Sequence, residues 1–260
     1  MHLYLPDGTP VYELPYAGNR QGTRPATLRD AKKLGLYPSV TEILKIIDKP
    51  GLNRWKEEQM MMACLTTPRI ENEPEAAYLK RVKKSAEEAS TIARDTGQAI
   101  HDAVEKRFNG LKPQDHAEVS QKIYDAICDR YGSRGWVAEH SFGAYGYGGR
   151  IDLMNRKPEK HRLEIVADLK TKEQLDTTKD GSYYGYDEHV AQLAAYAVGV
   201  GLKDALLVNV FSDWNGNVLF CEWLPDDVDR GLNLFNAAFE LWKIVKKYDP
   251  QNGNDPTRNW

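Results

Sequence analysis

The chain has 260 residues, of which 41% are hydrophobic and 28% are charged, and its formal net charge is -3. These values are typical of a globular protein with a sizeable core, and they exclude fibrous and disordered chains. No apolar run reaches the roughly 18 residues of a membrane-spanning helix, and the negative net charge excludes a protein that binds nucleic acid over a wholly basic surface.

The start of the chain and its cysteines bear on its compartment. Residues 1–8 have neither the basic start nor the apolar stretch of a secretory signal peptide. The three cysteines, Cys64, Cys128 and Cys221, lie far apart, which argues against a disulfide framework and against a thiolate-bound zinc or iron–sulfur centre. We therefore expect a cytoplasmic protein that does not associate with a membrane.

Basic residues are concentrated near the N-terminus. Residues 20–56 contain nine Lys or Arg and three Asp or Glu. Such an excess indicates either a basic surface that meets an acidic partner or a solvated face without one.

The first half of the chain predicts helices. Residues 1–37 are rich in Pro, Gly and polar residues, which indicates an irregular arm with a short hairpin around Asp7 and Gly8. Apolar residues at three- and four-residue steps then predict five helices. The first is capped by Ser39 or Thr41 and ends at residues 49–51, and the others cover residues 53–63, 75–92, 96–108 and 116–131.

The helix over residues 75–92 carries a basic stripe that includes Lys80 and Arg81. The same face then carries two Lys–Glu pairs at four-residue spacing, Lys83/Glu87 and Lys84/Glu88. Such pairs are typical of a solvated helix face, and we favour that interpretation over a surface that tracks DNA.

From residue 136 onward the apolar pattern changes to the alternation of strands. A three-stranded meander, a helix, two strands and a last helix are predicted over residues 136–142, 150–155, 163–170, 188–200, 205–211, 218–223 and 226–248. This order implies an α/β fold with a mixed central sheet flanked by helices. We expect an N-terminal arm and helical block over residues 1–95, the α/β core over 96–249 and a flexible tail over 250–260.

The predicted strands carry charges that need partners. Side chains alternate along a strand, so Asp168 and Lys170 share one face near a strand end. In the preceding strand Asp152 is flanked by apolar residues, where a charge is costly unless it is paired or bound to metal. Asp152 and Asp168 can meet on neighbouring strands, and Glu139 in the first strand has similar surroundings.

Converging carboxylates repel each other unless a cation lies between them. Oxygen ligands favour Mg²⁺ or Mn²⁺, which bind substrate phosphates, so a phosphodiester is the natural substrate. A metal ion and a neighbouring lysine together meet the needs of its hydrolysis. The alternative is a buried ion pair of Asp168 and Lys170 with Asp152 on a loop.

Six short motifs follow one another on the predicted elements. They are Pro38-Ser39-Val40-Thr41, Leu52-Asn53-Arg54-Trp55, Gly97-Gln98-Ala99-Ile100-His101, Gly149-Arg150-Ile151-Asp152, Asp168-Leu169-Lys170 and Gln192-Leu193-Ala194-Ala195-Tyr196. In this order the series resembles the PSVT, LxxW, GTxxH, GxxD, (D/E)xK and QxxxY motifs of the PD-(D/E)XK nuclease superfamily. Within it, the series is similar to the RecB-like exonucleases, which include the mitochondrial genome maintenance exonuclease and phage-encoded exonucleases.

The resemblance implies a restriction-endonuclease-like core with the N-terminal helices roofing a site at the sheet edge. It implies that Asp152, Asp168 and the carbonyl group of Leu169 hold Mg²⁺ or Mn²⁺, with His101 as a further metal ligand. It also implies that Lys170 orients the attacking water or stabilises the transition state.

Three further residues receive roles from the same resemblance. Glu139 would bind a second metal ion or its water. Gln192 and Tyr196 are one helical turn apart and would hold Lys170 or a phosphate in place. The alternatives are a structural role for His101 and a core position for Tyr196. The sequence departs from the family pattern at Gln98, where the family has Thr.

The connection after the catalytic strand is long and carries tyrosines. Tyr183, Tyr184 and Tyr186 either stack on bases or pack within the loop.

The resemblance implies a metal-dependent deoxyribonuclease, an exonuclease that acts on single-stranded DNA or DNA ends in a bacterium or phage-infected host. Its expected partners are DNA and a recombination or replication protein. One alternative is a structure-specific endonuclease on the same fold. Another is a catalytically inactive, nuclease-like subunit that binds DNA.

Overall fold

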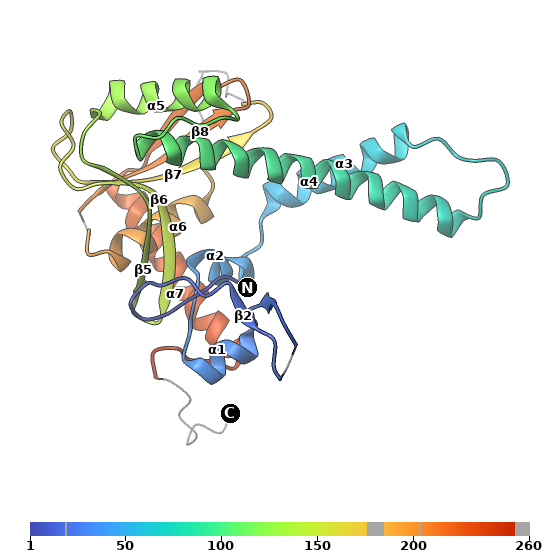
Figure 1. The fold of residues 1–260 in the computed structure, drawn as a ribbon, viewed down its shortest axis with the longest axis horizontal. Coiled ribbons are helices and arrows are strands. Elements are labelled where there is room, and N and C mark those ends of the chain that lie inside the picture. Colours follow the sequence, from blue (N-terminus) through green and yellow to red (C-terminus); the bar gives the residue numbers. More distant parts are fainter. Residues whose placement is uncertain (19, 176–184, 203, 253–260) are drawn as a thin grey trace.

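The computed structural model describes residues 1–18, 20–175, 185–202 and 204–252. At its centre is a five-stranded sheet in the order β5-β6-β7-β8-β9 (Figure 1). These strands are β5 (Trp136–Ala144), β6 (Tyr147–Asn155), β7 (Ile165–Lys172), β8 (Leu206–Asp213) and β9 (Val218–Glu222). Only β7 and β8 pair in parallel, and the other neighbours are antiparallel, so the predicted α/β fold with a mixed sheet is confirmed.

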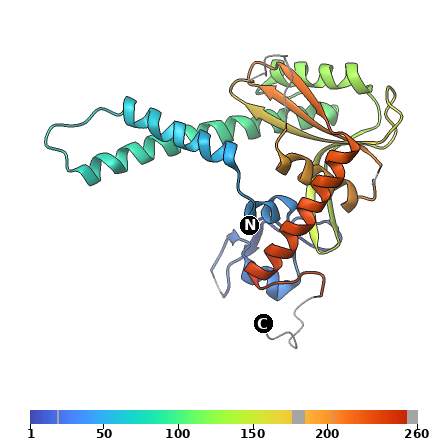
Figure 2. The ribbon, with the colours of Figure 1, turned by 180° about the vertical axis from the view of Figure 1, so that it is seen from behind.

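Helices cover both faces of the sheet (Figure 2). On one face α6 (Asp187–Gly199) and α7 (Pro225–Lys246) pack on residues such as Met154 and Val166. On the other face the C-terminal half of α4 (Glu75–Phe108) and α5 (Ala117–Tyr131) pack on Leu153 and Ala167. Because consecutive strand residues point to opposite faces, β6 and β7 bury apolar side chains on both faces of the sheet.

Residues 1–37 differ from the irregular arm that the sequence predicts. The hairpin around Asp7 and Gly8 is confirmed, because Tyr4 bridges Pro10 and the amide of Gly8 donates to the carbonyl of Leu5. The remainder also contains regular elements, which are β1 (Leu3–Tyr4), β2 (Glu13–Pro15), β3 (Thr23–Pro25), α1 (Leu28–Leu34) and β4 (Tyr37–Pro38). Leu3, Ala31 and Leu36 are buried in the same apolar cluster as α6 and α7. The arm is therefore part of the core.

The helical block also differs from the prediction. In place of the first expected helix, the structure has α2 (Val40–Ile43) followed by the short 3-10 helix η1 (Leu44–Ile46). Pro50, which is expected to end that first helix, instead begins α3 (Pro50–Thr66). The helices expected over residues 75–92 and 96–108 are a single helix, α4, because no Pro or other helix breaker separates them. The expected boundary between residues 95 and 96 thus falls inside α4.

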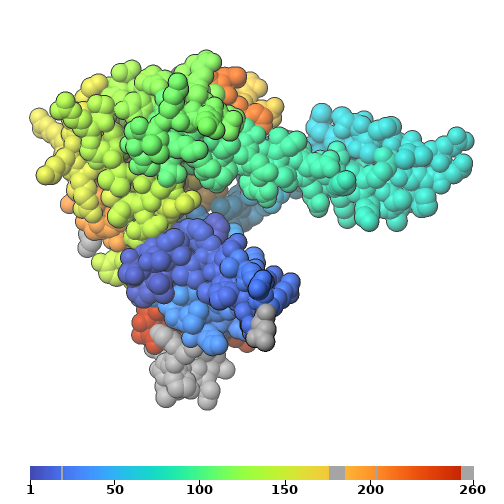
Figure 3. All heavy atoms as spheres, in the orientation of Figure 1, coloured from blue at the N-terminus to red at the C-terminus, as the bar shows by residue number. Residues whose placement is uncertain are grey.

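The helices α3 and α4 form an antiparallel hairpin that projects from the body of the molecule (Figures 1 and 3). The C-terminal half of α4, where Ile100 and Val104 are buried, packs on the body, and the first turn of α3 lies against Tyr186 at the start of α6. Although α4 has 34 residues, no helix among the described residues is long and apolar enough to cross a membrane.

Candidate active site

The candidate site lies where β6 and β7 separate. Their ladder ends at the pair Leu153 and Ala167, so Asp152 and Asp168 are the next two residues in register. Beyond that point the amide of Leu169 donates to Oδ2 of Asp152 at 2.8 Å and no longer to the β6 backbone. The end of the ladder therefore brings the two carboxylates together, as the positions of Asp152 and Asp168 in the sequence predict.

Asp168 is buried, at 2% exposure, and is surrounded by hydrogen-bond donors. Lys170 Nζ lies 2.8 Å from its Oδ2 atom, and Gln192 Nε2 donates to its Oδ1 atom at 2.7 Å. Asn209, its parallel neighbour on β8, donates through Nδ2 to Oδ2 at 2.9 Å. Lys170 also donates to Oε1 of Gln192 at 3.2 Å, so this glutamine touches both members of the ion pair.

The charges of this cluster depend on one another. Burial raises the pKa of Asp152 and the negative charge of Asp168 raises it further, while His101 and Lys170 act in the opposite direction. Burial lowers the pKa of Lys170, but the nearby Asp168 and Asp152 outweigh burial and hold the pKa above its usual value. Lys170 is consequently an ammonium group that compensates two close carboxylates.

His101 reaches the site from α4. Its Nδ1 atom lies 3.6 Å from Oδ2 of Asp152. One turn earlier, a Cβ atom on Gly97 would lie 2.8 Å from Oγ1 of Thr171, so the absence of a side chain lets α4 pass close to the end of β7. Gln98, where the motif that the sequence resembles has Thr, donates to Oδ1 of Asp102 on the exposed side of α4.

Glu139 lies on β5 opposite Asp152, in a gap between two register pairs of the β5–β6 ladder. Its backbone has the left-handed conformation, with φ 55°. It forms an ion pair with Arg150 of β6. Burial raises the pKa of Glu139 to about 7, and the charge of Asp152 contributes to the shift. The charge of Asp152 therefore affects Glu139, but the ion pair with Arg150 holds the Glu139 side chain at the edge of the carboxylate cluster.

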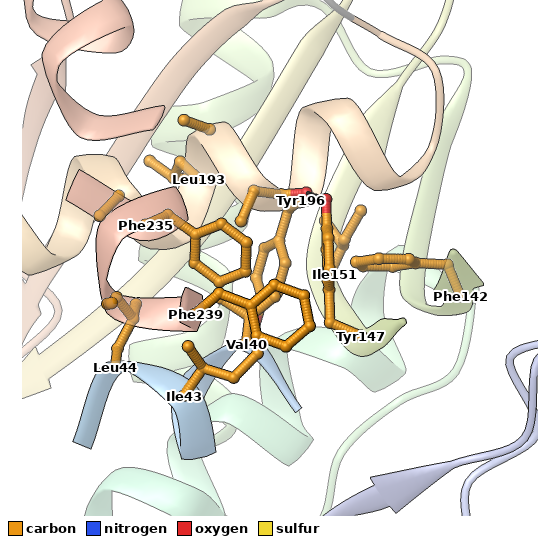
Figure 4. Packing of buried hydrophobic residues seen from close by; sticks show 14 of the residues in the cluster. Val40, Ile43, Leu44, Phe142, Tyr147, Ile151, Leu193, Tyr196, Phe235 and Phe239 are labelled. Atoms are coloured by element: carbon orange, nitrogen blue, oxygen red, sulfur yellow. Dashed lines mark hydrogen bonds between the residues drawn. The ribbon is translucent and has the colours of Figure 1, made fainter. Parts of the chain in front are cut away.

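Tyr196 is at the base of the cluster. It is buried among aromatic rings, including Phe142 at a centroid distance of 5.8 Å, and Figure 4 shows it beside Tyr147 and Phe235. Its hydroxyl accepts from Nε2 of Gln192 at 3.0 Å. A Cβ atom on Gly149 would lie 2.6 Å from its ring, which explains the glycine of that motif. Tyr196 thus positions Gln192, which in turn accepts from Lys170.

Sequence reasoning missed several polar neighbours. Asn209 is fully buried in β8 and accepts from Nε1 of Trp223 at 2.8 Å, and its place among apolar residues of a predicted strand is the same signal that identified Asp152. Lys49 and His189 also interact electrostatically with Lys170. They come from distant segments, and no local pattern marks them.

By chemical type, the predicted metal ligands suit a hard divalent cation. Asp152, Asp168 and the carbonyl group of Leu169 offer oxygen, and His101 adds one nitrogen, which suits Mg²⁺ or Mn²⁺. Asp152 and Asp168 follow the last register pair of the β6–β7 ladder, and the charge of Asp168 adds to the burial that raises the pKa of Asp152. Within the described ranges, no three or more His, Cys, Asp or Glu side chains are grouped so that they could hold a metal ion.

The remaining predicted site features lie in part outside the described residues. Tyr183 and Tyr184 fall in the range 176–184, and only Tyr186 of the three tyrosines is described, at 46% exposure.

Comparisons with known proteins add little to this geometry. No family model and no curated protein matches the chain. A solved structure described as "Crystal structure of SSO0001" aligns with a TM-score of 0.30 and 13% sequence identity, over 80% of this chain and 98% of that chain. A likeness at this level supports no conclusion on fold or activity, so the functional argument depends on the residues of this chain.

Proposed function

We propose that the chain is a divalent-metal-dependent deoxyribonuclease with a restriction-endonuclease-like core, and that it acts as an exonuclease on single-stranded DNA or DNA ends. One observation carries the proposal. Asp152, Asp168 and Lys170 converge where β6 and β7 separate, with Lys170 Nζ 2.8 Å from Asp168. Two close carboxylates and an ammonium group are the parts that metal-assisted phosphodiester hydrolysis requires.

Each group has a distinct task in this proposal. Asp152, Asp168 and the Leu169 carbonyl, with His101, would hold the cation, which supplies a nucleophilic water at neutral pH and compensates phosphate charge. Lys170 is kept protonated by its neighbours, so it donates hydrogen bonds to a phosphate oxygen as negative charge develops. Gln192 fixes the direction of the ammonium group through its 3.2 Å hydrogen bond.

The other motifs support the proposal because they position this cluster. Ser39 accepts from the amide of Glu42 at the start of α2 and bridges Gly148 at the start of β6. Gly97 and Gly149 allow close approaches to Thr171 and Tyr196. Motifs that are far apart in the sequence thus serve one region of the fold.

A nuclease assay tests the proposal. Linear single- and double-stranded DNA, labelled at the 5′ or 3′ end, is incubated with the protein in Mg²⁺ or Mn²⁺, alongside a closed circular substrate. We expect mononucleotides or short oligonucleotides from linear DNA, no cleavage of the circle and no activity in EDTA. Lys170→Ala and Asp168→Asn should each lower the rate at least about a hundredfold. Asp125→Asn, at a solvent-exposed hydrogen bond on α5, is the matched control.

The outcomes separate the alternatives. Cleavage of the circle would identify an endonuclease on the same fold. Salt-sensitive DNA binding without metal-dependent cleavage would identify an inactive binding subunit. Wild-type rates in both site variants would overturn the assignment of the residues.

A further inference from the structure

A second group of residues lies beside the candidate site, where the start of α3 meets the start of α6. A Cβ atom on Gly51 would lie 2.8 Å from both Cζ and Oη of Tyr186, so the first turn of α3 lies directly against this ring. Lys49 precedes this turn as its N-cap residue. Two segments that are far apart in the sequence therefore form one surface.

The ring of Tyr186 is accessible and lies in a cationic environment. Tyr186 is 46% exposed, and Nζ of Lys172, at the end of β7, lies 5.9 Å from its ring centroid. The amide of Tyr186 donates to Nδ1 of His189 at 3.2 Å, and the two rings are 5.4 Å apart. The hydrogen bond to Nδ1 fixes the start of α6 and with it the position of the tyrosine.

Electrostatic interactions connect this surface to the catalytic lysine. Burial lowers the pKa of Lys49, Lys170 lowers it further, and Glu188 acts in the opposite direction. Burial also lowers the pKa of His189 to about 3, with Lys170, Lys49 and Lys172 contributing. His189 is therefore neutral, and the charges of Lys170, Lys49 and Lys172 all act on it, while Asp168 acts in the opposite direction.

We propose that Lys49, Lys172 and Tyr186 form a nucleotide subsite for single-stranded DNA next to the catalytic cluster. The ring of Tyr186 stacks on a base, and the two ammonium groups bind the phosphate that follows the scissile one. Aromatic faces accept any base, and lysines contact phosphates without regard to sequence, so the subsite has no sequence preference. The inference rests on the proposed function, because it gives the strand its path to Lys170.

The chemistry of the surface favours a single strand over a duplex. In a duplex the base faces are stacked on one another, whereas a single strand leaves a face free for the tyrosine ring. Glu188 acts on both Lys49 and Lys170, so its carboxylate balances their charge when no phosphate is bound. An incoming phosphate therefore competes with Glu188.

Binding in EDTA tests the subsite separately from catalysis. The probe is a fluorescent 20-nucleotide oligo(dT), measured by anisotropy over a range of salt concentrations. We expect Tyr186→Ala to weaken binding about tenfold, Tyr186→Phe to retain it, and duplex affinity to change less than single-strand affinity. Lys49→Ala should reduce the slope of log K against log salt by about 0.7, the value of one phosphate contact with a single strand. Glu188→Gln should strengthen binding.

Matched controls and a kinetic measurement complete the test. Tyr145→Ala removes a tyrosine that is 61% exposed on the β5–β6 turn, and its oligonucleotide affinity should equal that of the wild type. In the cleavage assay the subsite variants should raise KM more than they lower kcat, whereas Lys170→Ala lowers kcat. Circular dichroism verifies that each variant is folded.

The two proposals fail in different ways. Oligonucleotide affinity that is the same in wild type, Tyr186→Ala and Lys49→Ala overturns the subsite, even if the wild type cleaves DNA. Binding that depends on Tyr186 and Lys49, without metal-dependent cleavage, overturns the nuclease and supports the subsite. A wild-type protein that does not bind the oligonucleotide overturns the subsite.

Discussion

Asn209 connects the carboxylate cluster to Trp223, which follows β9. Its amide group donates to Asp168 and accepts from the indole N–H of Trp223, so it fixes one oxygen of the carboxylate. Residues that orient metal-binding carboxylates change metal affinity by about 10- to 100-fold when they are replaced. We therefore expect Asn209→Leu to raise the Mg²⁺ concentration for half-maximal cleavage by about this factor.

A metal titration of the cleavage rate measures this effect. Trp223→Phe keeps the amide group of Asn209 and removes only the indole N–H that donates to it. The Mg²⁺ concentration for half-maximal cleavage should therefore rise less in this variant. A thermal melt of each variant verifies that the fold is intact. An unchanged Mg²⁺ dependence in Asn209→Leu would show that Asn209 has only a structural role.

Glu139 makes the stability of the fold depend on pH. Its pKa rises from 4.5 to about 7 on folding, so between these values the folded state binds more protons than the unfolded state. The free energy of unfolding therefore falls as the pH increases through this window, by up to about 3 kcal/mol. Glu139→Gln removes this contribution.

Urea denaturation in metal-free buffer at pH 5 and pH 8 tests the sign. The variant should gain stability relative to wild type as the pH increases, and the gain should be nearly complete at pH 8. Because burial also raises the pKa of Asp152, the variant retains part of the pH dependence. A difference between variant and wild type that is equal at the two pH values would contradict the assignment.

At the scale of elements, the contact between α4 and β7 depends on Gly97. Alanine is the better helix former by about 1 kcal/mol, yet its Cβ atom would lie 2.8 Å from Oγ1 of Thr171. We expect Gly97→Ala to move α4 away from β7, to displace His101 from Asp152 and to lower the cleavage rate. The double variant Gly97→Ala/Thr171→Ala removes the colliding oxygen and should recover activity. Full activity in Gly97→Ala alone would show that α4 tolerates the displacement.

The same elements show what the sequence can predict. The strands of the sheet and the meeting of Asp152 with Asp168 follow from alternation and from the adjacency of two strands, which are local rules. The helix α1 also has local signals, because Asp30 accepts from the amide of Thr27 and Gly35 ends the helix at φ 67°. The helix is only seven residues long, so its apolar pattern is too short to predict it. Lys49 and Tyr186 meet only through tertiary packing, so no pattern within either segment predicts their contact.

At the scale of the whole molecule, both ends of the described chain lie on one core. The hydroxyl of Tyr248 donates to the carbonyl groups of Ala31 and Leu36, which ties the end of α7 to the N-terminal arm. The protruding hairpin of α3 and α4 contributes a separate small cluster around Val82 and Ala86. Cooperative unfolding should therefore include the arm, and the distal part of the hairpin should contribute less to it.

Two leucines of the arm test this cooperativity. Leu3 is fully buried in the main cluster, whereas Leu34 at the end of α1 is 51% exposed. Leu3→Ala should lower the free energy of unfolding by about 2–5 kcal/mol, since it leaves a cavity in the shared core, and Leu34→Ala by less than about 0.5 kcal/mol. Tryptophan fluorescence, to which the buried Trp242 of α7 contributes, and far-UV circular dichroism should report the same shifted transition for Leu3→Ala. If the arm were a separate unit, Leu3→Ala would change an early transition in circular dichroism and leave the main tryptophan fluorescence transition in place.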